Sequence, residues 1–137
     1  MSKIQLGLVA VGTLMLQLLG GWDAMLQTLV ICVVLDYLTG ILAAAYCKDL
    51  SSQIGYKGII KKIGIFVVVM LACLMSQSMG NPVVRNMAIS FYISNEGISI
   101  LENIGKCDVD YPDFLRKLLD MLRKRGNDGD GTNKPTV

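Results

Sequence analysis

The sequence lacks histidine altogether and has little charge for its length. Of its 137 residues, 18% are charged and 53% are hydrophobic, whereas soluble domains usually carry about 25% charged residues. A chain without histidine has neither the commonest general base nor the commonest metal ligand. The composition therefore disfavours a histidine-based catalytic or metal centre, and it favours a small membrane protein.

The four cysteines lack the patterns that signal metal or redox chemistry. Cys32, Cys47, Cys73 and Cys107 form no C-x-x-C pair and have no disulfide-like spacing. Two of them lie inside apolar runs, where a thiol behaves as a small hydrophobic side chain. We therefore expect no metal and no cofactor, and we do not expect an enzyme.

What the chain does have is long apolar segments. Residues 24–46 form the clearest one, and a helix of that length runs about 35 Å, enough to cross a hydrocarbon core of roughly 30 Å. Residues 4–20 and 63–80 are further apolar segments and carry no charge, and residues 86–104 form a weaker, more polar segment. We expect an all-α integral membrane protein with about four transmembrane helices, arranged as two antiparallel hairpins.

The positions of lysine and arginine predict the topology. Residues 47–62 contain four lysines and are predicted to form a basic cytoplasmic loop. Four spans with both termini in the cytoplasm place twelve of the 13 basic residues inside and only Arg85 outside, as the positive-inside rule favours. By hydropathy alone, residues 86–104 could instead form a surface helix, but this charge distribution favours a span. Residues 126–137 have no apolar pattern and are predicted to be a disordered tail.

Residues 110–125 are predicted to form a short amphipathic helix in the cytoplasm. Leucines recur in this segment at helical spacing, and basic residues close it, as suits the negative end of a helix dipole. The helix would pack on a neighbouring subunit or rest on the anionic inner leaflet, where each basic residue contributes about 1 kcal/mol. The expected inner-leaflet contacts are Lys61, Lys62, Arg123, Lys124 and Arg125.

Two carboxyl groups lie inside the expected spans. Counted at the helical rise, Asp36 and Glu96 both lie near mid-depth, whereas Arg85 lies near the outer surface, too far to pair with Asp36. With no cation expected at their level, both carboxyls should be protonated and hydrogen-bonded, or should face a wetted interior. Alternatively, local polar side chains within the bundle satisfy them, the candidates being Thr39, Asn95 and Ser99.

Small residues share a helix face with Asp36. Gly40 and Ala44 form a small-x-x-x-small pattern, which allows another helix to come close. We expect this face to take part in self-association. The intramembrane polar and oligomerisation candidates are therefore Asp36, Thr39, Gly40, Ala44, Asn95, Glu96 and Ser99.

Three groups of residues carry a resemblance to a known family. They are Asp36-Tyr37-x-Thr39-Gly40, then Ser52 with Gly55 and Gly58-x-x-Lys61-Lys62, and then Asn95-Glu96-x-x-Ser99-Ile100-Leu101-Glu102-Asn103, which Pro112 follows. Over about residues 35–122 the chain resembles the bacteriophage holin family of the toxin-secretion and phage-lysis type. The resemblance implies a protein that accumulates in the bacterial cytoplasmic membrane, forms homo-oligomers and opens lesions. An endolysin or a large toxin would leave through them, and no nucleic acid takes part.

Two other classes stay open from the residues alone. A small proton-coupled membrane transporter would use Asp36 or Glu96 as its proton site, and it predicts substrate-dependent proton flux without killing. A non-conducting membrane adaptor would recruit a partner through the basic C-terminal region, and it predicts no change in permeability.

Overall fold

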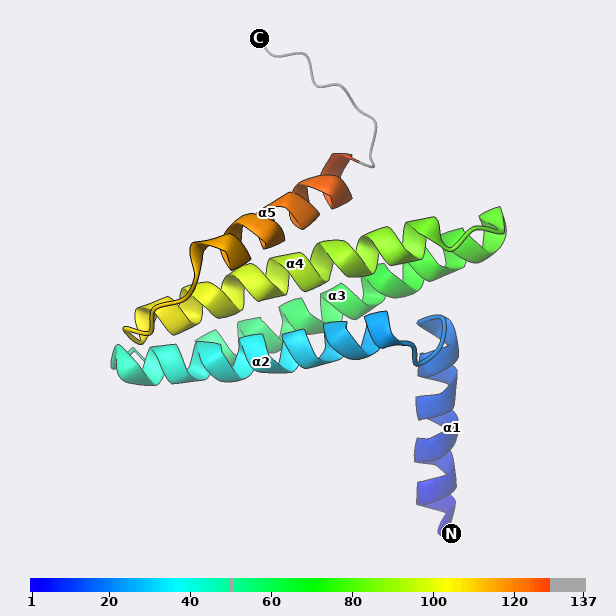
Figure 1. The fold of residues 1–137 in the computed structure, drawn as a ribbon. Coiled ribbons are helices and arrows are strands. Elements are labelled where there is room, and N and C mark those ends of the chain that lie inside the picture. The colour runs from blue at the N-terminus through cyan, green and yellow to red at the C-terminus, as the bar shows by residue number, and fades with distance from the viewer. Residues whose placement is uncertain (50, 129–137) are drawn as a thin grey trace.

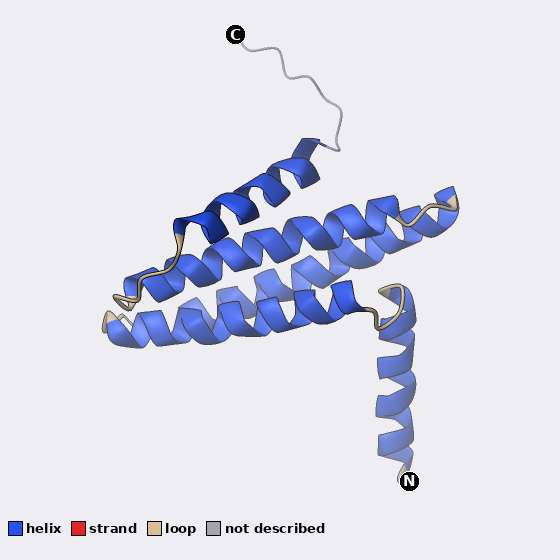
Figure 2. Cartoon of the chain, viewed as in Figure 1, coloured by secondary structure: helices blue, strands red, loops and turns tan. Residues whose placement is uncertain are grey.

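The chain folds into five α-helices (Figure 1), and the computed structural model describes residues 1–49 and 51–128. The described residues contain helices and short connections and no strand (Figure 2), so the prediction of an all-helical protein is confirmed. The helices are α1 (Lys3–Leu18), α2 (Ala24–Tyr46), α3 (Ser52–Met79), α4 (Val83–Lys106) and α5 (Asp113–Asp128).

Helix α4 organises the fold, because it packs against α2 and α3 on one side and against α5 on the other (Figure 1). The apolar core between α2, α3 and α4 lies in the half of the bundle nearer the connections at residues 19–23 and 80–82. The buried core residues are Leu19, Leu26, Leu29, Val33, Ile65, Val69 and Ile89. We call the opposite end of the bundle, with the connections at residues 47–51 and 107–112, the Tyr46 end.

Within the part of the chain that the structure describes, two helices are long and apolar enough to cross a membrane: Ala24–Tyr46 and the Gly55–Met79 part of α3. Only 22% of the residues in each apolar stretch are buried inside the protein, so most of their surface needs another apolar environment. Lipid supplies one. Helix α4 does not qualify, and α1 is apolar but has only 16 residues. The structure therefore gives two candidate spans where we expected four.

Helix α1 stands apart from the bundle. None of its residues is buried, it points away from the other helices in Figure 1, and it contacts only α3. In the described structure, α1 and α2 therefore do not pack together as the antiparallel hairpin that we predicted. The turn at Gly20 and Gly21 sets the direction of α1, since both glycines have positive φ angles of 85° and 96°.

Helix α3 begins eleven residues earlier than predicted, so residues 52–62 of the expected basic loop at residues 47–62 are helical. The lysines in residues 47–62 led us to expect a loop. The segment contains no proline, however, so its sequence is compatible with a helix. Its glycines lie beside Tyr37, since a Cβ built at Gly55 or Gly58 would be in ordinary van der Waals contact with that side chain, at 3.5 or 3.7 Å. A long α3 carries Lys62 into the bundle, whereas Lys61 stays exposed.

The observed boundaries of α4 and α5 differ less from the predicted ones. Helix α4 extends beyond the predicted 86–104 at both ends, and α5 begins three residues later than predicted. Of the predicted tail, residues 126–128 are helical, and residues 129–137 lie outside the described part of the chain.

Candidate functional site: a charged cluster beside a polar cleft

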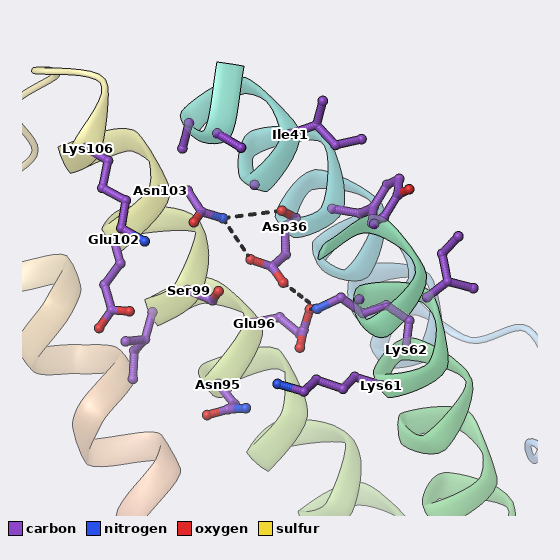
Figure 3. Close-up of a pocket in the computed structure, with 18 of the residues that line it drawn as sticks. Asp36, Ile41, Lys61, Lys62, Asn95, Glu96, Ser99, Glu102, Asn103 and Lys106 are labelled. Atoms are coloured by element: carbon purple, nitrogen blue, oxygen red, sulfur yellow. Dashed lines mark hydrogen bonds and ion pairs between the residues drawn. The ribbon is translucent and has the colours of Figure 1, made fainter. Parts of the chain in front are cut away.

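Three charged side chains from three helices meet inside the bundle. The Lys62 ammonium on α3 donates to Asp36 Oδ2 on α2 and to Glu96 Oε2 on α4 (Figure 3). The side chains of Lys62, Asp36 and Glu96 are 17%, 10% and 5% exposed. We call these three residues the charged cluster. It joins the helices by ion pairs that are shielded from bulk water.

The three residues meet because they lie at one level. Each lies ten residues from the helix terminus at the Tyr46 end, which is about 15 Å at the helical rise of 1.5 Å per residue. The prediction that Asp36 and Glu96 have no cation at their level is therefore wrong. It depended on placing Lys62 in a loop.

Asn103 holds the other side of the Asp36 carboxyl group. Its Nδ2 lies 3.1 Å from Asp36 Oδ1, 3.3 Å from the Asp36 carbonyl oxygen and 3.1 Å from Thr39 Oγ1. Both carboxylate oxygens of Asp36 are therefore engaged, one by Lys62 and one by Asn103 (Figure 3). Sequence analysis did not single out Asn103 as a site residue. The available signal was its spacing of seven residues from Glu96, which places both on one helix face.

A cleft of about 1340 Å³ between α2, α3 and α4 reaches the cluster. Its acidic lining residues are Asp36, Asp49, Glu96 and Glu102, and its basic ones are Lys61, Lys62, Lys106 and Arg123. Equal numbers of each sign give the cleft no preference for anions or cations. It is a polar, wettable surface between apolar helices.

The other predicted site residues divide into two groups. Gly40, Ala44, Asn95, Ser99, Lys61 and Arg123 line the cleft, whereas Lys124 and Arg125 are exposed on α5. A Cβ built at Gly40 would lie 3.6 Å from Asn103 Nδ2, so the close approach at this small residue occurs within the chain. Within residues 1–49 and 51–128, no three Cys, Asp or Glu side chains gather where they could hold a metal ion.

A second polar site lies at the opposite end of the bundle, around the buried Arg85 of α4. Its guanidinium donates to both carboxylate oxygens of Asp23, at 2.7 and 3.2 Å, and to the Leu19 carbonyl oxygen at 2.8 Å. The backbone N–H of Arg85 donates to Ser76 Oγ at 2.8 Å. We call this group the Arg85 clamp. Through it, α4 holds the turn between α1 and α2, a role that sequence analysis did not assign to Arg85.

Asp23 has two roles in the clamp, because it also caps α2 by accepting from Leu26 N at 2.9 Å. The hydrogen bond from Arg85 lowers the pKa of Asp23 below its ordinary value of 3.8. The unfolded chain binds a proton there more readily, so the stabilisation is complete above pH 3.8 and is lost as the pH falls through the lowered pKa. The clamp is therefore intact at neutral pH.

The two glycines of the turn predict a matched pair of mutants. Gly20→Ala and Gly21→Ala both place a side chain at positive φ, which costs about 1–2 kcal/mol. A Cβ at Gly20 would also lie 2.4 Å from Arg85 Nε, whereas a Cβ at Gly21 meets nothing within 4 Å. We therefore expect Gly20→Ala to lower the unfolding temperature in detergent clearly more than Gly21→Ala. Equal effects would mean that Arg85 moves aside freely.

An all-helical chain with two helices apolar enough to cross a membrane, and with charged groups held between its helices, is typical of a small helical membrane protein. The chain belongs to the bacteriophage holin family, whose model matches residues 13–124. This match covers both polar sites and confirms the resemblance drawn from the sequence.

Several proteins are similar to this chain over most of their own length, and one of them is named a probable holin. An uncharacterized protein of Clostridium perfringens strain 13 is 42% identical over 126 residues, covering 90% of this chain and 93% of its own length. A probable holin of Bacillus phage phi105 is 31% identical over 98 residues, covering 71% of this chain and 73% of its own. No solved structure matches the chain.

Proposed function

We propose that the protein is a holin that accumulates and oligomerises in the bacterial cytoplasmic membrane. It then forms lesions that release a cell-wall hydrolase or a large toxin. The observation that carries this proposal is the charged cluster, enclosed between α2, α3 and α4, of which α2 and α3 have apolar outer surfaces. Such a chain can remain stable in lipid while its polar surface stays enclosed between the helices.

The lesion has to come from several chains, because one chain is closed at one end. Beyond the cluster, Leu26, Leu29, Val69 and Ile89 have no exposed surface and fill the space between the helices. If neighbouring chains brought their polar clefts together, those surfaces would line a common opening. Lipid-facing apolar surfaces would remain outside.

Hydration of the charged cluster would accompany opening. The attraction between Lys62 and its two carboxylates is strong in a low-dielectric interior and much weaker in water. Water that enters between α2, α3 and α4 therefore weakens the contacts that hold the three helices together. The closed bundle and the hydrated lesion are then two alternative arrangements of the same helices.

We further propose that α1, α2, α3 and α4 all span the membrane, with both termini in the cytoplasm. An impermeant thiol reagent added from outside should then label a cysteine at Asn81 and leave cysteines at Lys48 and Thr132 unlabelled. The native cysteines are replaced for this measurement, and permeabilised cells provide the control for reactivity. Outside labelling at Lys48 would contradict the proposed topology.

The charged cluster and its cleft also favour a second function, a small proton-coupled transporter. One expression experiment separates the two functions: the protein is induced in a bacterium while membrane potential and culture density are followed together. A holin causes sudden depolarisation, and the culture lyses only when a wall hydrolase is co-expressed. Growth without depolarisation contradicts the holin proposal, and added substrate that drives proton uptake would then select the transporter.

A further inference from the structure

Helix α5 packs closely on α4 through two glycines. A Cβ built at Gly97 would lie 3.0 Å from Leu119 Cδ1, and one built at Gly126 would lie 2.8 Å from Phe91 Cβ. From the Tyr46 end, α5 thus runs back along α4 as far as Phe91 (Figure 1). Phe91 lies fifteen residues before the end of α4, which is about 22 Å along the helix.

This docked position conflicts with a membrane-spanning α4. Helix α5 carries Arg116, Lys117, Arg123, Lys124 and Arg125, most of them on its solvent side. Arg116 and Arg123 have carboxylate partners, Glu102 and Asp120. Beside a spanning α4, however, Lys117, Lys124 and Arg125 would lie in hydrocarbon, where unpaired charges are strongly unfavourable. Docking of α5 on α4 and spanning by α4 therefore exclude each other.

The exposed face of α5 indicates an alternative position for this helix. Phe114, Leu118 and Met121 recur at helical spacing on one face and are 64%, 49% and 57% exposed. Lys117, Lys124 and Arg125 are exposed around them. An apolar strip bordered by cations suits the surface of a bilayer that contains anionic phospholipid, with the strip among the acyl chains and the cations at the headgroups.

We propose that α5 leaves its docked position on α4 and binds an anionic lipid surface instead. This exchange exposes the face of α4 that α5 covers, so that α4 can enter the membrane. The proposal rests on the proposed spanning arrangement of α4. In the docked state α5 covers one face of α4, and in the lipid-bound state that face is free to meet lipid or a second copy of the chain. The exchange couples the lipid at the membrane surface to the position of α4.

A disulfide between α4 and α5 tests the exchange. Leu119 Cγ, near the position that a cysteine Sγ would take, lies 3.6 Å from a Cβ built at Gly97, so small adjustments allow a bond. The full chain, with its native cysteines replaced, carries Gly97→Cys and Leu119→Cys. It is reconstituted in vesicles of phosphatidylcholine alone or mixed with phosphatidylglycerol. After mild oxidation, the thiols that remain in the monomer are counted with a polyethylene glycol maleimide.

We expect phosphatidylglycerol to lower the disulfide-linked fraction by about tenfold, because several cations bind the anionic surface together. A variant with Lys117→Gln, Lys124→Gln and Arg125→Gln should stay linked in both lipids. Its control carries Lys3→Gln, Lys48→Gln and Lys57→Gln, which remove the same charge elsewhere, and it should behave like the parent. Equal linking in both lipids, or a control that matches the α5 variant, would overturn the exchange. The readout needs no lesion, so absence of permeabilisation would count against the proposed function alone.

Discussion

Replacing Lys62 with methionine should be the most damaging single change inside the bundle. It leaves the carboxylates of Asp36 and Glu96 in a shielded position without their shared cation. Breaking a buried ion pair by removing one partner costs about 3–5 kcal/mol. We therefore expect Lys62→Met to accumulate poorly in membranes and to unfold well below the wild-type temperature in detergent. Immunoblots of the membrane fraction and thermal unfolding measure the two effects.

The controls follow from counting charges. With all three groups ionised, one ammonium faces two carboxylates, so Glu96→Gln removes an excess negative charge and should be tolerated. The triple variant Asp36→Asn, Lys62→Met, Glu96→Gln leaves no unpaired charge and should recover most of the lost stability. If Lys62→Met accumulated and unfolded like the wild type, the ion pairs would not hold the helices together.

Replacing Arg85 with methionine should have the second largest effect, and it acts at the other end of the molecule. The change removes the cation beside Asp23 and leaves the Leu19 carbonyl oxygen without its donor. We expect a loss of about 3 kcal/mol, the lower end of the range for a broken buried pair, because the half-exposed Asp23 carboxylate can be rehydrated. Thermal unfolding in detergent measures this loss.

The clamp also predicts a change in the position of α1. In Arg85→Met the turn at Gly20 and Gly21 loses its anchor, so protease should cut near residue 20 faster than in the wild type. Arg85→Lys keeps the charge but not the forked geometry of the guanidinium, and it should lie between the two. Unchanged cleavage in Arg85→Met would show that packing alone fixes α1.

The sequence predicted helices wherever a long apolar run dominates. The segment at residues 24–46 matches α2 residue for residue. Hydropathy failed where a helix is polar for a tertiary reason. Residues 52–62 are rich in lysine, yet they are helical because Lys62 finds carboxylates on two other helices.

The candidate site was predictable only in part. Asp36 and Glu96 are conspicuous as carboxyls inside apolar or partly apolar helices, and the structure brings them together. Their shared cation, Lys62, was missed because α3 begins earlier than predicted, and Lys62 was assigned to a loop. The Arg85 clamp was hidden because it joins the turn at residues 19–23 to the start of α4, and no local pattern reveals a contact over 62 residues of chain.

The proposed function requires that assembled chains open a hole wide enough for a folded protein. The most direct measurement uses purified wild-type protein in vesicles that contain both a small dye and a folded fluorescent protein. We predict that above a threshold of protein per vesicle both contents are released together, and that Lys62→Met, matched for incorporated protein, shifts this threshold. Release of the dye alone at every protein density would contradict the claim and would leave a narrow channel or transporter instead.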